Sequence, residues 1–189
     1  EIVLPKDVHG ESINLKGKNV TIRSTDPNDP NIVAATVIGG VEGAAAVTFQ
    51  SGEDANCALS GLTITGGNTG VYCSGAAPTI RNCVVTGSSG PGVKAWNVSG
   101  PTIIGSSIAD NAGFGVEASF GRGITSYVTI RNATIVGNSG GGIFSGIVTV
   151  TNSIIYYNEG DQISDGATVT YSDVQGGYPG QGNLDCDPC

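Results

Sequence analysis

The sequence predicts an all-β fold, a β-solenoid of about seven to eight coils whose short strands stack into three parallel sheets. Glycine supplies 31 of 189 residues, about 16% against an ordinary value near 7%, which favours many tight turns. Related segments recur every 19 to 27 residues from residue 58 onward. No window keeps the apolar spacing of an α-helix over three turns, whereas alternation of apolar and polar residues is frequent.

The composition excludes several classes of protein. Sixteen acidic residues against eight Lys and Arg give a net charge of −8, which leaves too few bases for a phosphate backbone, so we expect no nucleic-acid partner. No apolar run reaches the ~18 residues that would cross a bilayer, so we expect no membrane-spanning segment. The length favours one domain over residues 1–189.

Residues 1–57 are expected to form irregular opening coils. Short strands are indicated at Asn19-VTIRS, Thr36-VIGG and Ala46-VTFQ, but their spacing is less even than in the segments that follow. Residues 58–175 are expected to form the regular coils, and residues 176–189 follow them as a C-terminal tail.

The regular coils are defined by six segments that begin at Ala58, Thr79, Thr102, Thr129, Thr149 and Thr168. Alternate residues of each strand face the interior. The first strand places Leu59, Ile80, Ile103, Ile130, Val150 and Val169 inside, the second places Ile64, Val85, Ile108, Ile135, Ile155 and Val174 there, and the third places Val71, Val93, Val116, Ile143 and Ile163 there. Three apolar columns therefore predict three sheets around one core.

A two-residue bend separates the first strand of each coil from the second. Asn82, Asn132 and Asn152 share one position in this bend, and Asn tolerates the left-handed backbone that the bend requires. We expect the amide of each to bond to the Asn of the adjacent coil. The next, inward position is small or apolar, with Leu62, Cys83, Ser106, Ala133, Ser153 and Ser172.

The five cysteines are expected to have structural roles. Cys57, Cys73 and Cys83 fall at inward positions, where a free thiol packs as a small hydrophobe, and a Cys57–Cys73 bridge is left open. Cys186 and Cys189 are compatible with a local disulfide, half of a metal site or a cross-link between molecules. No second Cys-x-x-Cys or matched His accompanies them, so no structural zinc is predicted.

Several segments resemble bacterial secreted right-handed parallel β-helix proteins of the pectate-lyase-like superfamily. They are Pro78-TIRNCVVTG, Val128-TIRNATIVGN, Val148-TVTNSIIYYN and Thr168-VTYSDVQGG, with Gly17-KNVTIRSTDPNDPN near the start. The resemblance implies a right-handed parallel β-helix and an extracellular or cell-surface location. It specifies activity poorly, because this architecture hosts lyases, hydrolases, epimerases, adhesins and modules without known catalysis.

The resemblance also bears on the two ends of the solenoid. Similar proteins usually begin with a short amphipathic helix over the first coil and continue past the Asp-Pro near the end, whereas this sequence starts at a strand and stops at Cys189. We therefore expect uncovered coil ends, which favour end-to-end association into a homo-oligomer.

Catalytic groups are sparse in the sequence. Hydrolases of this fold need clustered carboxylates, and lyases need a Lys or Arg base beside acidic Ca²⁺ ligands. Lys94 and Glu117 are expected as outward neighbours on adjacent coils, with Arg122 in the insertion that follows, but no ladder of acidic residues accompanies them. The only histidine, His9, is expected in a solvated turn. These three residues are weak catalytic candidates.

One outward surface carries aromatic residues. The predicted ligand-binding side chains are Tyr72, Trp96, Phe120 and Phe144, which belong to or follow the third strand of their coils. Aromatic rings beside a few polar groups suit a polysaccharide or other glycan. The resemblance implies that the same sheet forms the cleft of related enzymes. The alternative is a set of scattered surface aromatics and one tolerated insertion.

A second outward face, after the Asn bend, is apolar and includes Val84 and Ile154. A contiguous patch there would mark an interface between copies of the chain. The alternative is that these residues are present only because they favour strands.

Repeated Thr-x-Thr pairs, as on ice-binding solenoids, are expected only at Thr63 and Thr65. Acidic turns at Asp26-PND, Gly160-DQISDG and Asp185-CDP are candidate Ca²⁺ sites, but such residues also simply form turns, so no cofactor is the leading prediction.

These observations favour a non-catalytic extracellular or cell-surface β-helix module with a structural, adhesive or glycan-contacting role. The alternative is a polysaccharide lyase or other carbohydrate-active enzyme that acts from the outer face of one sheet.

Overall fold

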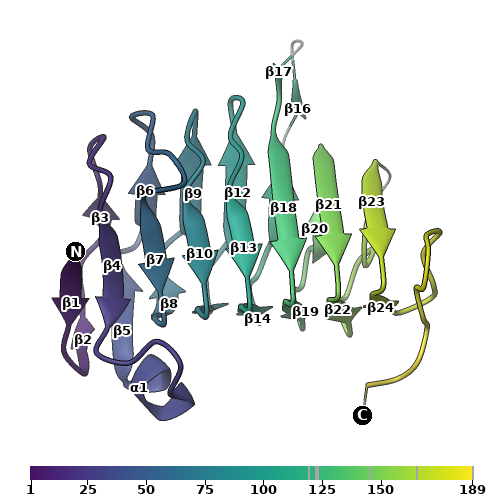
Figure 1. Ribbon diagram of the computed structural model, residues 1–189, viewed down its shortest axis with the longest axis horizontal. Coiled ribbons are helices and arrows are strands. Elements are labelled where there is room, and N and C mark those ends of the chain that lie inside the picture. The colour runs from purple at the N-terminus through teal and green to yellow at the C-terminus, as the bar shows by residue number, and fades with distance from the viewer. Residues whose placement is uncertain (119, 122–123, 145, 165, 189) are drawn as a thin grey trace.

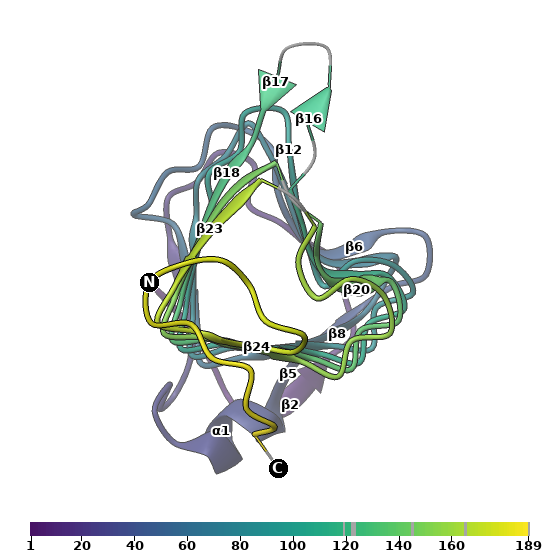
Figure 2. The same ribbon diagram turned by 90° about the vertical axis from the view of Figure 1, so that its right-hand side faces the viewer.

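The chain winds into a solenoid whose three faces are parallel β-sheets (Figures 1 and 2). The computed structural model describes residues 1–118, 120–121, 124–144, 146–164 and 166–188. Within these residues, sheets 1 and 2 have eight strands each and sheet 3 has six, and the strand order follows the coils one after another. The predicted β-solenoid is confirmed, and the eight strands of sheet 1 correspond to about seven turns.

Each of the first six coils contributes one short strand to each sheet, and the last two coils contribute named strands to sheets 1 and 2 among the described residues. Sheet 1 contains β1 (Ile2–Leu4), β4 (Thr21–Ser24), β7 (Ala58–Ser60), β10 (Thr79–Arg81), β13 (Thr102–Ile104), β18 (Tyr127–Arg131), β21 (Ile147–Thr151) and β23 (Ala167–Thr170). Sheet 2 contains β2 (Asp7–His9), β5 (Thr36–Gly40), β8 (Thr63–Gly66), β11 (Val84–Thr86), β14 (Ser107–Ala109), β19 (Thr134–Val136), β22 (Ile154–Tyr156) and β24 (Asp173–Val174). Sheet 3 contains β3 (Ile13–Asn14), β6 (Ala45–Phe49), β9 (Thr69–Ser74), β12 (Val93–Trp96), β15 (Phe114–Ala118) and β20 (Gly141–Phe144).

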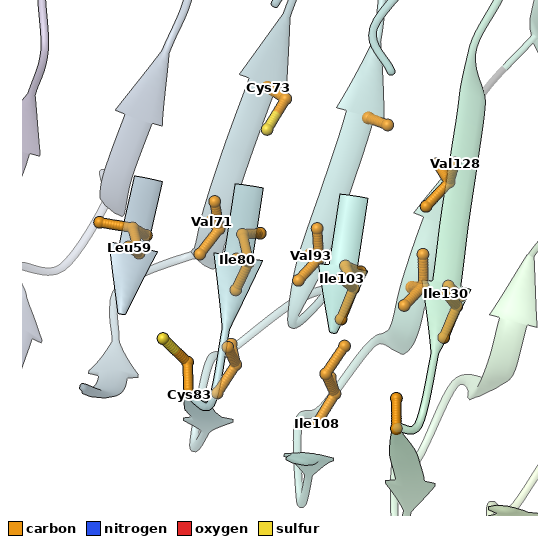
Figure 3. Packing of buried hydrophobic residues seen from close by; sticks show 14 of the residues in the cluster. Leu59, Val71, Cys73, Ile80, Cys83, Val93, Ile103, Ile108, Val128 and Ile130 are labelled. Carbon is orange, nitrogen blue, oxygen red and sulfur yellow. The ribbon is translucent and has the colours of Figure 1, made fainter. Parts of the chain in front are cut away.

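The interior is filled by columns of apolar side chains that run from coil to coil (Figure 3). In sheet 1, Ile80 pairs with Ile103 and Ile103 with Ile130, and all three side chains are fully buried. Because neighbouring strands lie ~4.8 Å apart, identical positions of successive coils are in van der Waals contact. The predicted inward columns are confirmed, and they fix the register that places the outward residues.

The small inward column after the bend between sheets 1 and 2 is held together by serine hydroxyls. Ser106 Oγ accepts from Cys83 N at 3.1 Å, Ser153 Oγ accepts from Ala133 N at 3.2 Å, and Ser172 Oγ accepts from Ser153 N at 3.1 Å. A small side chain fits the limited space at this position, and a hydroxyl group there also supplies a hydrogen-bond acceptor. Each hydroxyl satisfies a buried backbone N–H that the sharp bend leaves out of the sheet ladder.

The bend itself has the left-handed backbone predicted from its Asn residues. Asn82, Asn132 and Asn152 have φ values of 51°, 53° and 50°. The expected bond to an Asn of the next coil is wrong for Asn82, because that coil has Gly105 at the same position. Asn82 Nδ2 instead donates to Asn28 Oδ1 at 2.9 Å, which ties the bend to a loop of the opening coils.

A ladder of Asn side chains lies at a different corner, between sheets 2 and 3. Asn111 Nδ2 donates to Asn138 Oδ1, and Asn138 Nδ2 donates to Asn158 Oδ1, each at 2.9 Å. Asn158 Nδ2 continues the series to Gln162 Oε1 at 2.8 Å. The three Asn side chains are buried, so the ladder satisfies polar groups that the apolar interior would otherwise leave unpaired.

Two elements depart from the regular coils. The unpredicted helix α1 (Pro30–Ala35) lies against the outer side of sheet 2, where Thr63 Oγ1 donates to Val33 O at 3.0 Å (Figure 2). The sequence carries a signal for its start, because Asp29 is the N-cap residue and Pro30 is the first residue of the helix.

The hairpin of β16 (Phe120–Gly121) and β17 (Ile124–Thr125) projects from the corner between sheets 3 and 1 (Figure 2). No helix among the described residues is long and apolar enough to cross a membrane.

The tail after residue 175 folds back across the C-terminal end of the solenoid (Figure 2). Leu184 forms a parallel bridge with Asp173, and Tyr171 N donates to Gln181 O at 2.8 Å. Asn183 Nδ2 donates to Val169 O at 3.0 Å. The expectation of an uncovered coil end is therefore wrong at this end, because the tail pairs with the last strands.

Candidate functional site

The outer face of sheet 3 brings together most of the predicted site residues. Thr48, Tyr72, Lys94, Glu117 and Phe144 pair in register across five successive strands and form one file along the solenoid axis. Their inward neighbours, such as Val71 and Val93, are fully buried, so alternation turns every member of the file outward. The core packing therefore fixes the spacing of this outward file.

Lys94 and Glu117 form an ion pair at the centre of the file. Lys94 Nζ lies 2.8 Å from Glu117 Oε1, and the two side chains are 30% and 19% exposed. This contact confirms that they are outward neighbours on adjacent coils. It also means that Lys94, the weak candidate for a catalytic base, already has a carboxylate partner.

A shallow hollow of about 340 Å³ adjoins the N-terminal half of the file. Its lining combines the turn before β6, the turn before β9 and the outer side of sheet 3, with Gly43, Ala44, Ala45, Thr48, Gln50, Asn68, Thr69, Tyr72 and Lys94. Tyr72 and Lys94 supply an aromatic ring and a cation, and the other polar members supply hydroxyl and amide groups. The volume is within the range of small-ligand sites.

The remaining predicted ligand-binding residues are not among the residues that line this hollow. Trp96 is 46% exposed at the end of β12, one outward position beyond Lys94. Phe144 is 38% exposed and packs its ring against Phe114 at a centroid distance of 5.1 Å. Phe120 belongs to β16, but its side chain and the whole of Arg122 lie outside the described residues. Among the predicted aromatics whose side chains the structure describes, only Tyr72 lines the hollow.

Four polar residues of the hollow, Thr48, Gln50, Asn68 and Thr69, were missed by sequence reasoning. Thr48 and Gln50 belong to the irregular opening coils, where no repeat fixed their orientation. Asn68 lies in a turn, and its Nδ2 donates to Gly43 O at 3.1 Å, which joins the two turns that form one wall. The pairing of Thr48 with Tyr72 could have been found only by aligning β6 with the regular coils.

The second predicted face, on the outer side of sheet 2, is partly covered by α1 and by the C-terminal tail. Val84 lines a hollow of about 400 Å³ together with Pro27, Pro30 and Val33, so α1 forms one of its walls. Ile154 is half-buried, and the adjacent Tyr156 donates its hydroxyl to Asp185 Oδ1 of the tail at 3.1 Å. Burial, followed by this hydrogen bond to Asp185, raises the pKa of Tyr156 to about 12.

The buried cysteines have no reactive character. Cys57, Cys73 and Cys83 are buried free thiols at the predicted inward positions. Burial raises the pKa of all three, that of Cys83 to about 11, so the thiolate form is suppressed at neutral pH. Cys186 is an exposed free thiol, and Cys189 lies outside the described residues.

Within the part of the chain that the structure describes, no three His, Cys, Asp or Glu side chains are grouped as metal ligands would be. Asp26 of one candidate calcium turn accepts from Asn28 N at 3.0 Å, as a turn-forming Asp does. His9, expected in a turn, is the last residue of β2, and its Nε2 lies 3.4 Å from Pro5 O.

Comparison with known proteins yields one match. The family model described as a right-handed β-helix region matches residues 8–177. No curated protein and no solved structure gives a significant match.

Proposed function

The chain belongs to the family of right-handed β-helix proteins, and from this premise we propose that it is a non-catalytic extracellular or cell-surface module that binds glycans. The binding surface is the outer face of sheet 3, which we call the sheet 3 face and define by Thr48, Tyr72, Lys94, Glu117 and Phe144 with the adjoining hollow. The observation that carries the proposal is the register of Tyr72 with Thr48 and Lys94, at the edge of a hollow of about 340 Å³.

The chemistry of the sheet 3 face supports a sugar ligand. The Tyr72 ring offers an apolar plane for the C–H face of a pyranose. Thr48, Gln50 and Asn68 offer hydroxyl and amide groups that both donate and accept hydrogen bonds. The hollow is shallow and runs along successive coils, so an extended chain of sugars fits its shape better than a compact small molecule.

The Lys94–Glu117 ion pair supports binding over catalysis. A lyase base must be free to contact the substrate, whereas Lys94 Nζ is engaged by the Glu117 carboxylate 2.8 Å away. The pair instead holds both side chains in place as a fixed polar contact for sugar hydroxyls.

A titration series tests this function. Isothermal titration calorimetry against neutral and acidic oligosaccharides is expected to identify at least one ligand. Tyr72→Ala is expected to bind that ligand about three- to tenfold more weakly, because the aromatic contact is lost. Tyr171→Ala, an exposed aromatic at the C-terminal end, is the matched control and is expected to bind unchanged. Equal affinity of Tyr72→Ala and the parent protein would reject the sheet 3 face.

A further inference from the structure

The outer face of sheet 1 carries two straight files of side chains that run along the solenoid axis. The first file contains Thr21, Ala58, Thr79, Thr102, Thr129, Thr149 and Thr168, and the second contains Arg23, Ser60, Arg81, Ile104, Arg131, Thr151 and Thr170. The expectation of Thr-x-Thr only at Thr63 and Thr65 is therefore wrong, because β21 and β23 present two such pairs in register.

Arginines alternate with other residues over the first five members of the second file. Arg23 and Arg81 are separated by Ser60, and Arg81 and Arg131 are separated by Ile104. Two steps of ~4.8 Å between parallel strands place these positions about 10 Å apart along the axis. That spacing is comparable to the length of one disaccharide unit in an extended polysaccharide.

Two of these guanidinium groups have no acidic partner in the described part of the chain. Arg23 Nε lies 2.7 Å from Glu1 Oε1, so Arg23 is neutralised. Arg81 Nε donates to Ser60 Oγ at 3.0 Å, which is a neutral partner. Arg81 and Arg131 are exposed and have no ion pair among the described residues.

The face around these arginines is open, and the Glu1 carboxylate at its N-terminal end is paired with Arg23. Figure 1 looks directly onto sheet 1, and α1 lies below it rather than over it. The outward positions of β4 to β23 hold Thr, Arg, Ser, Ala, Ile and Tyr but no Asp or Glu, in a chain whose net charge is −8. The positive charge of this face is thus a local feature that contrasts with the rest of the molecule.

We propose that the outer face of sheet 1 binds an extended acidic polysaccharide that lies along the solenoid axis. Arg81 and Arg131 contact carboxylate or sulfate groups on alternate sugar units, and guanidinium groups suit both because they donate two parallel hydrogen bonds. The intervening threonine file supplies hydroxyl groups for the sugar hydroxyls. This surface is separate from the sheet 3 face, so the two proposals fail or succeed independently.

The observations favour a polysaccharide over a nucleic acid. Two unpaired guanidinium groups on an acidic chain are too few to neutralise a continuous phosphate backbone. Tyr127 is the single aromatic residue at the outward positions of β4 to β23, too few for a series of stacked bases, whereas the threonine hydroxyl groups match a polymer with many hydroxyl groups.

Affinity electrophoresis and calorimetry with hyaluronan, polygalacturonate and heparin test the proposal, with dextran as a neutral polymer and double-stranded DNA as another polyanion. At least one acidic polysaccharide is expected to bind, and dextran is expected not to bind through this face. The double variant Arg81→Gln/Arg131→Gln is expected to lose about tenfold or more in affinity for that polysaccharide. The control variant Lys6→Gln/Lys16→Gln changes the net charge by the same amount at positions outside this face. Its affinity for the polysaccharide is expected to fall by less than about twofold.

A second variant separates specific recognition from general attraction of polyanions. Thr129→Val keeps the shape and charge of the face but removes one hydroxyl group. This variant is expected to bind the polysaccharide about two- to tenfold more weakly. The proposal is overturned if no acidic polysaccharide binds, if the double Arg variant binds like the parent protein, or if DNA binds as tightly as the polysaccharide. Loss of binding only in Tyr72→Ala would place the ligand on the sheet 3 face instead.

Discussion

Buried polar side chains set the stability of individual coils. Asn138 is fully buried, accepts from the backbone N and Nδ2 of Asn111, and donates to Asn158 Oδ1 and to two carbonyl oxygens. Each of these bonds satisfies a group that has no access to water, so the side chain acts as a polar link between three coils.

Asn138→Ala is expected to lower the free energy of unfolding by about 1–3 kcal/mol, because it leaves buried donors and acceptors on neighbouring coils unpaired. Denaturant unfolding followed by circular dichroism measures this change. The exposed turn residue Asn56 provides the control, and Asn56→Ala is expected to change stability by less than about 0.5 kcal/mol. Similar small effects in both variants would contradict a stabilising ladder.

Glu53 is a buried carboxylate that joins the first two coils. Its Oε1 accepts from Gly17 N at 2.8 Å, and its Oε2 accepts from Ser51 N at 2.9 Å. Burial raises the pKa of this carboxyl group, but the backbone N–H groups of Ser51 and Gly17 oppose that effect and hold the pKa below its ordinary value. The charged form is therefore the one that the fold stabilises.

The sign of the pH dependence follows from this lowered pKa. The unfolded state binds the proton first as the pH falls, so the stabilisation by Glu53 is complete above the unfolded pKa of about 4.3 and is lost as the pH falls through the lower folded pKa. Glu53→Gln is expected to be less stable at pH 7 by about 1–3 kcal/mol and to lose less stability between pH 5 and 3 than the parent protein. Parallel pH profiles of the two proteins would contradict this role.

At the scale of elements, the tail covers the last strands through backbone hydrogen bonds. Leu184 N donates to Ser172 O at 2.9 Å, and Val174 N donates to Leu184 O at 3.0 Å. The tail thereby pairs with the edge of β24, an edge that would otherwise be free to pair with another chain.

Leu184→Pro removes the donor to Ser172 and is expected to detach the tail. Hydrogen exchange at the Tyr171 and Val174 amides, both of which donate to tail carbonyls, is expected to accelerate at least about tenfold. Leu184→Ala keeps the backbone donor and is the matched control, with a smaller expected change. Unchanged exchange in the Pro variant would show that the tail does not protect this edge.

At the scale of the whole molecule, the regular coils follow directly from the sequence. Apolar alternation and the Asn bends set the register of residues 58–175, and this register alone predicted that Lys94 and Glu117 are neighbours. The hollow was not predictable, because Thr48 and Gln50 lie in coils without a clear repeat, and contacts between turns depend on the path of each loop. The tail was unpredicted for a similar reason, since its pairing with β24 follows no repeat.

The solenoid presents chemically different faces around one core. Sheet 3 carries an aromatic and polar file, sheet 1 carries hydroxyl and guanidinium groups, and sheet 2 is partly covered by α1 and the tail. Since the core residues repeat and the outward residues do not, recognition resides in the outward files rather than in the fold itself.

The central claim is that the protein binds glycans without cleaving them, and the chain length of a bound polysaccharide tests it most directly. The polysaccharide that binds most tightly is incubated with the protein, and its molar mass is followed by size-exclusion chromatography with light scattering. An unchanged molar mass together with retained binding is the predicted result. A progressive decrease that disappears in Lys94→Ala would contradict the claim and identify the sheet 3 face as the active site of a lyase or hydrolase.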